Sequence, residues 1–574
     1  MIRKSSKILG FLFALMLIFI LITTGGIVNY TAVKNVILLI PDGMSIGGTT
    51  LARWYNGGQP LAMDEMACGL VRTYSSDAPI ADSAPAGTAF ATGFKSSTGF
   101  IAMLPDKFGM PNITPVDKDK ELSPVATVLE AARLAGKAVG IVSTSETSHA
   151  TPATFSSHAI SRKEMNKIAE QQAYNFIDLI MGGGANYFKA DKRSDKEDLI
   201  NFFKEQKYSL VTTRDDLLKI NSPKILGLFA DGPMAYDFDR VGTNEPSLAE
   251  MTAKAIEILS KNKNGFFLMV EGSEIDWAAH ANDPVALIGD ILAFDKAVKV
   301  ALDFAKKDKN TIVIVVSDHG NSGITIGNRA TSNDYDKRKL EEFIAPLKKA
   351  KLTAEGVEKM INDDMGIDQI KAIIAEYYGI SDLTDKETEE IVKYFEMKKA
   401  KDPKKPYSLA YVLGPMMANR AYIGFTTNGH TGEEVVLYIY SPYKDKPTGV
   451  IDNIDIAFYI EKVLGLNLKR TTDLLFNKIE TKVQEEATVK FNKKYSKNVA
   501  LVYSDKSDSN NPKLIIIQSD GVSLIFPENK NYCIDKDGKI VKIFKGVTVF
   551  NGNDWFLSKE AIDLIEMKKN KEIN

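Results

Sequence analysis

Cysteine is scarce in this sequence. The 574-residue chain contains only two cysteines, Cys68 and Cys533, which lie far apart. Neither belongs to a C-x-x-C or Cys/His-clustered pattern, so the sequence does not indicate a thiolate zinc site. We expect Cys68, in the segment MACGLV, to be a small core residue, and we expect no disulfide between the two cysteines.

The chain also lacks an excess of charge of either sign. Its 72 basic and 74 acidic residues leave a formal net charge of −2. A nearly neutral chain creates no long-range field that would attract a polyanion, so nucleic acid is not expected as a partner. The 44% hydrophobic and 25% charged content is typical of a globular protein. Because the chain is too long for one simple core, we expect one large domain with additions.

A long uncharged apolar run occurs at residues 8–22, directly after Arg3, Lys4 and Lys7. This order of basic and then hydrophobic residues is typical of a secretory signal, whereas a buried core helix fits poorly beside three cations. We expect residues 1–26 to be a signal peptide. Because the run extended through TTGGIV approaches the ~20 residues that cross a bilayer, an uncleaved membrane anchor is the alternative. The chain is therefore expected to be extracytoplasmic, either secreted or anchored at the cell surface.

Five apolar runs predict buried strands. Hydrophobicity in them is continuous rather than alternating, which favours strands that are buried on both faces of a mostly parallel sheet. We predict an α/β fold with three α/β/α layers. The runs are NVILLI (35–40), AVGIVST (138–144), GFFLMVEG (265–272), TIVIVVSD (311–318) and EVVLYIYS (434–441). Acids stand at the ends of three runs, Asp42, Glu271 and Asp318, where ligands of such sheets bind.

Two regions depart from this pattern. Residues 331–415 are charged and favour helices, with apolar residues three and four apart, so we predict a helical insertion that divides the catalytic domain into residues 27–330 and 416–475. Residues 476–574 contain short apolar segments between polar turns, which predicts a small β-rich C-terminal domain. Its segment NGNDWFLSKEAIDLI resembles repeats of bacterial surface-stalk or cell-wall-associated domains, which suggests an association with the cell surface.

Histidine is rare too, but four of the five histidines lie beside acids or hydroxyls at strand ends or in loops, namely His149, His280, His319 and His430. Sets of carboxylates and imidazoles are suitable ligands for Zn²⁺. His158 is the exception, and we expect it to be a helix residue that packs near the site.

Two other sequence features favour a metal or phosphate site, but each also has a simpler structural explanation. Asp276 and His280 are four residues apart, so on a helix they share a face and could bind one metal or form a simple surface contact. Asp82 and Ser83 precede a small-residue run that predicts a helix start. A hydroxyl at a helix N-terminus is suited to meet a phosphate, although a serine there can also be a simple cap.

Six segments, in order, resemble the successive motifs of the alkaline phosphatase family: ILLIPDGMS, IADSAPAGTAFATG, SHATPATFSSHAISR, LMVEGSEIDWAAHAND, VVSDHG and NGHTGEE. The resemblance covers roughly residues 35–325 and 417–470. It implies a phosphoric monoester hydrolase whose substrates are small-molecule phosphate monoesters. Family members are commonly dimers, which makes a homodimer an expectation as well.

The resemblance also implies a role for each matched residue. Ser83 matches the nucleophile that becomes phosphorylated, and Arg162 matches the arginine that holds the phosphate oxygens. Two zinc ions and a third metal, usually Mg²⁺, are implied. The matched ligands are Asp42, Asp318 and His319 for the zinc that activates the serine; Asp276, His280 and His430 for the second zinc; and Asp42, Thr151 and Glu271 for the third metal.

Two departures concern the third metal. His149 stands where some members have an acid, and Trp277 replaces a basic or histidine residue, although other members have His and Trp at these positions. The change of charge leaves Zn²⁺ or Co²⁺ as alternatives to Mg²⁺, because imidazole suits softer ions than an all-oxygen site does.

Two alternative functions would be expected to have different sequence features. A phosphodiesterase or sulfatase of the same superfamily would be expected to show a threonine nucleophile or a C/S-x-P-x-R motif. A catalytically inactive surface-binding protein would be expected to have lost ligands, and none of the matched positions is lost.

Overall fold

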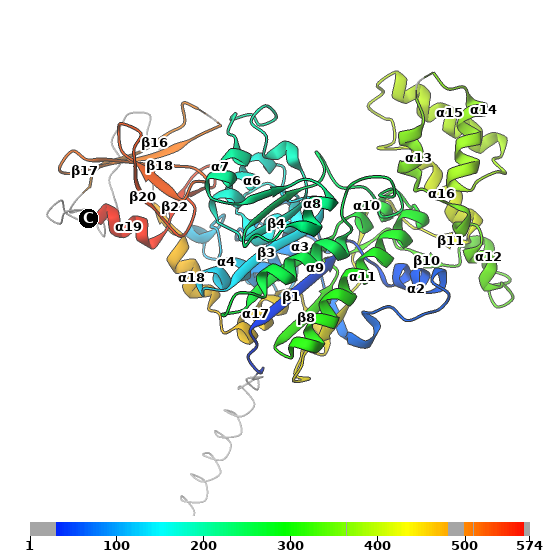
Figure 1. Cartoon of the computed structure of the whole chain (residues 1–574), viewed down its shortest axis with the longest axis horizontal. Coiled ribbons are helices and arrows are strands. Elements are labelled where there is room, and N and C mark those ends of the chain that lie inside the picture. The colour runs from blue at the N-terminus through cyan, green and yellow to red at the C-terminus, as the bar shows by residue number, and fades with distance from the viewer. Residues whose placement is uncertain (1–29, 363, 480–498, 509, 567–574) are drawn as a thin grey trace, which may run out of the picture.

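The structure, a computed structural model, describes residues 30–362, 364–479, 499–508 and 510–566 (Figure 1). The expected signal peptide or anchor at residues 1–26 lies outside the described residues. Among the helices that are described, none combines the length and apolar character needed to cross a membrane.

A ten-stranded sheet forms the centre of the described chain. All of its strands run in one direction except β13, which is antiparallel to both of its neighbours. The five runs predicted from the sequence all form strands of this sheet. From edge to edge, the order is β14 (Gly449–Asp452), β2 (Ala67–Arg72), β13 (Val435–Tyr440), β8 (Thr311–Val316), β1 (Asn35–Pro41), β7 (Phe266–Gly272), β3 (Ala138–Glu146), β4 (Leu179–Gly183), β6 (Ile225–Leu228) and β5 (Ser209–Val211).

Each face of the sheet has its own hydrophobic core. Along β1, Ile37 and Leu39 belong to one buried cluster, whereas Val36, Leu38 and Ile40 belong to the other. Successive side chains of a strand point to opposite faces, so both faces are covered and the continuous apolar run is explained. The prediction of three α/β/α layers is confirmed.

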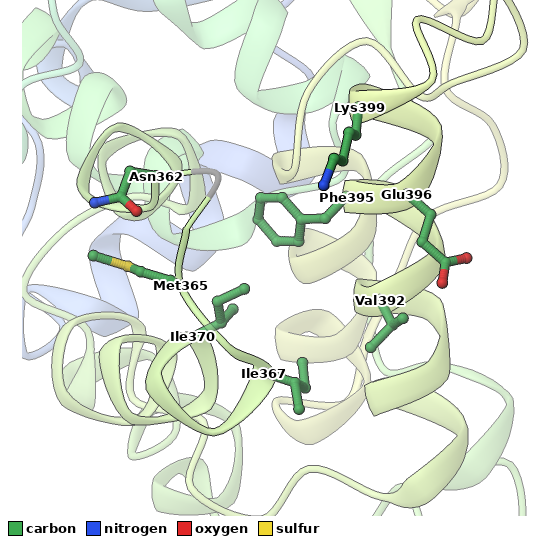
Figure 2. Close-up of a pocket in the computed structure, with 8 residues that line it drawn as sticks. All are labelled: Asn362, Met365, Ile367, Ile370, Val392, Phe395, Glu396 and Lys399. Carbon is green, nitrogen blue, oxygen red and sulfur yellow. The ribbon is translucent and has the colours of Figure 1, made fainter.

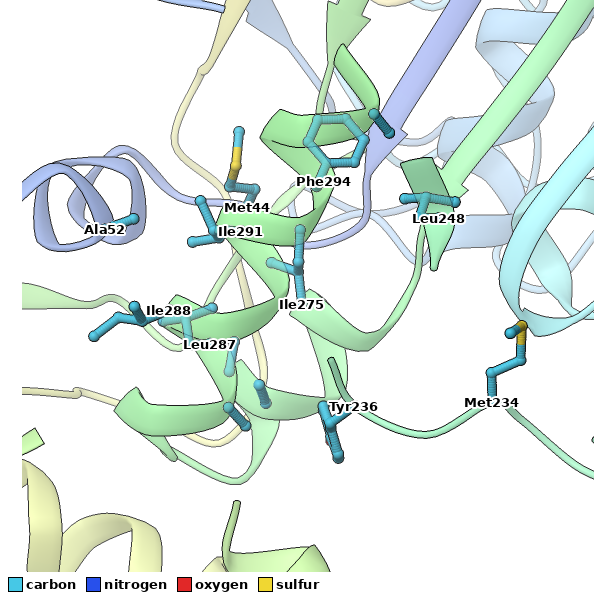
Figure 3. Packing of buried hydrophobic residues seen from close by; sticks show 14 of the residues in the cluster. Met44, Ala52, Met234, Tyr236, Leu248, Ile275, Leu287, Ile288, Ile291 and Phe294 are labelled. Atoms are coloured by element: carbon cyan, nitrogen blue, oxygen red, sulfur yellow. The ribbon is translucent and has the colours of Figure 1, made fainter. Parts of the chain in front are cut away.

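Helices α9 (Leu248–Leu259) and α11 (Pro284–Asp308) cover the first face. Figure 3 shows Ile291 and Phe294 of α11 near Met44, which follows β1, with Leu287 further along the same helix. The second face is covered by α4 (Val128–Leu134), α5 (Ala150–Ser156), α6 (Met165–Tyr174) and α17 (Ile454–Leu464). The remaining helices of the catalytic domain are α2 (Ile46–Tyr55), α3 (Ser83–Thr92), α7 (Leu199–Glu205), α8 (Arg214–Lys219), α10 (Glu274–His280) and α18 (Leu468–Leu475).

The predicted insertion is helical, and it lies at one end of the molecule in Figure 1. It contains α12 (Leu340–Ile344), α13 (Ala354–Met360), α14 (Ile367–Ile373), α15 (Asp385–Lys399) and α16 (Ala410–Arg420). The expected boundary at residue 415 falls inside α16, so the helical segment continues to Arg420. Between α14 and α15, a pocket of about 210 Å³ is lined by Ile367, Ile370, Val392 and Phe395 (Figure 2).

The C-terminal region is rich in antiparallel strands and lies at the opposite end of the molecule (Figure 1). One sheet contains β16 (Val499–Asp505), β17 (Lys513–Gln518), β18 (Ser523–Pro527), β19 (Tyr532–Ile534) and β20 (Ile540–Ile543). The other contains β15 (Asn477–Ile479), β22 (Trp555–Leu557) and β21 (Val549–Phe550), and helix α19 (Lys559–Glu566) follows.

The two cysteines are free thiols, as expected. Cys533 is buried, but Cys68 lies on β2, a strand near the sheet edge, and is only partly buried. Cys68 packs against the core of the second face without being enclosed by it, because β2 leaves most of its side chains open to solvent, so the expectation of a core residue holds only in part.

Candidate active site

The acids at the strand ends lie side by side. Strand β1 lies between β7 and β8, and Ile40 is the register partner of Glu271. Asp42 follows β1, Glu271 is near the end of β7, and Asp318 follows β8 by two residues. All three carboxylates are fully buried. Parallel pairing thus collects three acids from distant segments at the carboxyl edge of the sheet.

The imidazole of His319 joins this group to the predicted nucleophile. Its Nε2 lies 3.1 Å from Ser83 Oγ, 3.2 Å from Asp318 Oδ2 and 3.4 Å from Asp42 Oδ1. Ser83 is the first residue of α3, and Asp82 occupies the cap position. The hydroxyl therefore lies at a helix N-terminus, where free N–H groups and the helix dipole favour an anion.

A second group lies beside the first. Asp276 and His280 share one face of α10, with His280 Nε2 3.3 Å from Asp276 Oδ2. His430 Nε2 lies 3.1 Å from His280 Nε2 and 3.6 Å from Asp276 Oδ1. The rings of His430 and His319 stack with centroids 3.6 Å apart. One ligand atom from each of Asp276, His280 and His430 lies close enough to the others to share an ion.

The segment around His430 is part of a small two-stranded sheet. His430 and Thr431 form a short strand, β12, that pairs with β9 (Gly320–Asn321). Because β9 follows His319 directly, this pairing holds the two histidines beside each other.

A third group includes Asp42, His149 and Glu271, which offer ligand atoms within 4.8 Å of one another. Ser145 donates a hydrogen bond of 3.3 Å to Glu271 Oε2. Thr151 lies on α5, directly after the turn that holds His149. Burial lowers the pKa of His149 to about 3, with a further contribution from the Arg162 guanidinium, so this imidazole is neutral at ordinary pH.

Arg162 faces the same site. Its Nη1 pairs with Asp82, and its Nη2 donates a 2.9 Å hydrogen bond to His149 Nε2. The guanidinium is a quarter exposed, so it remains open to a ligand from the solvent side. Trp277 packs the edge of its ring against His149, with centroids 5.5 Å apart, and is outside the metal-ligand groups.

Buried polar atoms that lack a hydrogen-bond partner indicate whether the site is suited to metal ions. Such an atom in a protein interior is costly unless something else satisfies it. The site concentrates them at both oxygens of Asp42, Oδ2 of Asp318, Oγ1 of Thr151 and Oε1 of Glu271. These oxygens and the neighbouring imidazoles are suitable donors for divalent cations.

The electrostatics support the same conclusion. Burial, and then the negative charge of Asp318, raises the pKa of Asp42 well above its usual value. Burial also raises the pKa of Glu271 to about 7. The carboxylates therefore repel one another when no cation is bound. Asp276 differs: burial opposes its charged form, but the hydrogen bond from His280 and the positive charge of the neighbouring imidazoles together lower its pKa.

Sequence reasoning missed two partners in the site. Asn321 donates a 2.6 Å hydrogen bond to Asp276 Oδ1, and Asp82 pairs with Arg162. Asn321 directly follows the motif VVSDHG, and Asp82 lies within IADSAPAGTAFATG but had no assigned role there. That proximity was the signal that could have identified them.

The expectation that His158 is a helix residue is wrong. It lies two residues beyond the end of α5, not within a helix. Its Nε2 is 3.1 Å from Glu130 Oε1 and its Nδ1 is 3.1 Å from the Ala102 carbonyl, and the ring is buried. His158 is therefore half of a structural pair beneath the segment that leads to Arg162.

Three groups of acids and imidazoles, with a serine and an arginine beside them, define a candidate site of a metal-dependent hydrolase. Comparison with known proteins identifies the family. The family model described as alkaline phosphatase matches residues 33–466. The chain therefore belongs to the alkaline phosphatase family, whose members are metal-dependent hydrolases of phosphate monoesters.

Individual relatives agree with this assignment. The chain is 37% identical to alkaline phosphatase 3 of Bacillus subtilis (strain 168) over 77% of this chain and 91% of that protein. It is 39% identical to alkaline phosphatase 4 of the same organism over 75% and 89%, respectively. The crystal structure of Thermus thermophilus alkaline phosphatase superimposes with a TM-score of 0.68 at 29% identity, over 77% of this chain and 95% of that one.

Proposed function

We propose that this phosphatase hydrolyses phosphate monoesters through a phosphoserine formed on Ser83. The observation that supports this most directly is the position of Ser83 Oγ, 3.1 Å from His319 Nε2 and at the N-terminus of α3. A serine in this position is at once near a metal-ligand group and among N–H groups that favour a phosphoryl group.

Two zinc ions are the proposed cofactors of the first two ligand groups. Asp42, Asp318 and His319 would hold one, since His319 Nε2 lies near an oxygen of each acid. Asp276, His280 and His430 would hold the other, and Asp276 also lies close to Asp42 and His319. When bound, zinc lowers the pKa of a coordinated hydroxyl or water and offsets the charge of the phosphoryl oxygens. A third metal at Asp42, Thr151 and Glu271 is proposed to be Mg²⁺, with Zn²⁺ or Co²⁺ as alternatives because His149 is adjacent.

The residues of the chain account for the two chemical steps. Arg162 orients the phosphate through its guanidinium, which Asp82 and His149 hold in place. Ser83 Oγ attacks phosphorus, its bond to phosphorus forms as the ester P–O bond breaks, and the alcohol leaves with a proton. Water then attacks the phosphoserine, which restores the serine hydroxyl and releases inorganic phosphate. Positioning and charge neutralisation are the main requirements of such a transfer.

Export is also proposed, on the basis of the basic and then apolar order of residues 1–26. N-terminal sequencing of the protein from a membrane fraction and from the medium tests it. A new N-terminus near residues 23–26 is expected if the segment is a cleaved signal, and an intact N-terminus in the membrane fraction if it is an anchor. An intact N-terminus in the cytoplasmic fraction would overturn export.

Replacing the serine tests the main proposal. Ser83→Ala is expected to lower the turnover of an aryl phosphate monoester by at least about a thousandfold, because the nucleophile is removed. Zinc content, measured by elemental analysis, should stay the same. Ser209→Ala, on the edge strand β5, is the matched control. A near-normal rate for Ser83→Ala, or a preference of the unmodified enzyme for a diester of the same alcohol, would contradict the proposal.

A further inference from the structure

A large cavity opens beside the candidate active site. Its volume is about 940 Å³, within the range of small-molecule sites. The catalytic domain contributes His149 and Trp277 to its wall. The helical insertion contributes the opposite wall, including Tyr407 and Tyr411. We call this cavity, with the rings of Trp277, Tyr407 and Tyr411, the aromatic cleft.

The aromatic cleft is continuous with the site that holds phosphate in the proposed function. His149 lines the cleft and also accepts the hydrogen bond from Arg162. Trp277 is the neighbour of Asp276 in sequence and contacts His149. A group attached to a bound phosphate would therefore extend into the cleft.

The charges on the insertion side of the cleft are paired internally. Lys359 Nζ lies 2.9 Å from Glu355 Oε1, and Lys398 Nζ lies 2.6 Å from Glu358 Oε1. Two lysines are thus paired with two glutamates, so these described charged residues of the wall offer no unpaired charge with which to select a charged leaving group. Its distinguishing feature is the flat surface of its aromatic rings.

The segment that carries Tyr407 and Tyr411 is held in place by a hydrogen bond from its backbone. Glu358 Oε2 accepts a 2.7 Å hydrogen bond from the backbone N–H of Leu409, midway between Tyr407 and Tyr411. The two tyrosine rings meet edge to face with centroids 6.3 Å apart. Tyr407 is 86% exposed, so one face of its ring is open to a ligand. Tyr411 is partly buried at the first turn of α16.

We propose that the aromatic cleft binds the leaving group of the substrate and favours monoesters whose leaving group contains a flat, uncharged aromatic ring. The inference rests on the proposed function, because it assumes that phosphate binds beside Ser83 and Arg162. Aryl phosphates and nucleoside monophosphates share the required ring, and stacking on Trp277 and the tyrosines would supply the preference.

Kinetics of tyrosine variants test this inference. The specificity constants kcat/KM are measured for 4-nitrophenyl phosphate, adenosine monophosphate and glycerol 2-phosphate. For Tyr411→Ala and Tyr407→Ala, the ratio of aromatic to alkyl kcat/KM is expected to fall about tenfold, chiefly through KM. Tyr411→Phe should keep most of the ratio, because it retains the ring. Tyr335→Ala is the matched control, an exposed tyrosine of the same insertion that does not line the cleft.

The outcomes separate the inference from the proposed function. An equal loss with all three substrates, or no change in the ratio, would overturn the aromatic cleft as a leaving-group site. A fall with adenosine monophosphate alone would support a nucleoside as the natural group, and a fall with both aromatic substrates would support a general preference for aromatic rings. Competitive inhibition by inorganic phosphate reports separately on the phosphate site, and its loss together with retained hydrolysis would count against the proposed function instead.

Discussion

The helical insertion and the C-terminal region are both additions to the same sheet domain, yet they are attached to it in different ways. They lie at opposite ends of the molecule (Figure 1). The insertion falls within the span that matches the family, residues 33–466, whereas the C-terminal strands lie beyond it. The insertion lines the cleft at the active site with ion pairs near solvent, while the C-terminal region is held to the sheet domain by buried charges.

The buried contact centres on Lys530. Its ammonium pairs with Glu170 and Glu197, and it lies 4.3 Å from the ring centroid of Tyr174. The neighbouring Asn529 donates a 3.0 Å hydrogen bond to Glu170 Oε2. Glu170 is on α6, which follows the segment that holds Arg162. The C-terminal region therefore inserts a cation into a group of acids on the catalytic domain.

This acidic group resembles a metal site in its geometry, since Glu170, Asp195 and Glu197 offer oxygens close to one another. Side-chain cations of the chain already fill it. Lys530 contacts two of the acids, and Arg193 pairs with Asp195. The same residue types therefore serve different purposes in the two places. Acids with unsatisfied oxygens lie at the active site, whereas acids with cation partners join two parts of the fold.

The largest expected effect comes from removing the buried cation. Lys530→Met should lower the free energy of unfolding by about 3–5 kcal/mol, because it removes the cation that pairs with the buried Glu170 and the partly buried Glu197. Chemical denaturation of the metal-loaded protein measures the change. The matched variant is Lys398→Met in the insertion. The Lys398 side chain is 39% exposed, so its ion pair with Glu358 should contribute about 1 kcal/mol or less. Equal effects of the two variants would contradict the contrast between the two additions.

A smaller effect is expected in the pH dependence of stability, through Glu528. Burial raises the pKa of Glu528 to about 7, although Lys167, 3.1 Å away, opposes this shift. In the folded protein, Glu528 therefore keeps its proton up to about pH 7. In the unfolded chain, the same carboxyl group loses its proton near the ordinary pKa of 4.5. Stability should therefore fall as pH rises from about 4.5 to 7, by up to about 3 kcal/mol.

Glu528→Gln should remove this part of the pH dependence. The free energy of unfolding of the variant and of the unmodified protein is compared at several pH values between 4.5 and 7.5, so that contributions common to both cancel. Glu205→Gln, an exposed acid on α7, serves as the control and should leave the profile unchanged. A variant whose profile parallels that of the unmodified protein would show that Glu528 has an ordinary pKa.

Buried pairs of this kind could not be predicted from the sequence, whereas several site residues could. The strand-end acids Asp42 and Asp318 and the helix-start Ser83 could be found because each follows from a local pattern, a continuous apolar run or a run of small residues. Pairs formed by tertiary packing have no such local signal. His158 and Glu130 are 28 residues apart, and Lys530 and Glu170 are separated by most of the chain.

The aromatic cleft had no local signal for the same reason. The sequence predicts the helices of the insertion from their periodicity, but not which face meets the catalytic domain. That face is determined by packing between segments more than a hundred residues apart, such as those that contain Trp277 and Tyr411. The metal-ligand groups could be anticipated only because six ordered motifs resembled a known family.

The smallest expected effect lies at an ion pair of the insertion. Arg420 on α16 binds Glu387 on α15 through two nitrogens, at 2.6 and 2.9 Å. Hydrogen bonds from Arg420 lower the pKa of Glu387 to about 2, and the pair is about one-fifth exposed. Since the folded-state pKa is depressed, the stabilisation is present above the ordinary pKa of 4.5 and is lost as pH falls towards 2.

Glu387→Gln is therefore expected to cost about 1 kcal/mol or less at pH 7 and still less near pH 3, because solvent screens a pair close to the surface. Thermal unfolding at both pH values measures the difference. Glu390→Gln, an exposed acid of the same helix, is the control. If Glu387→Gln destabilised the protein as much as Lys530→Met, the contrast between a solvent-screened ion pair inside the insertion and the buried one at Lys530 would be wrong.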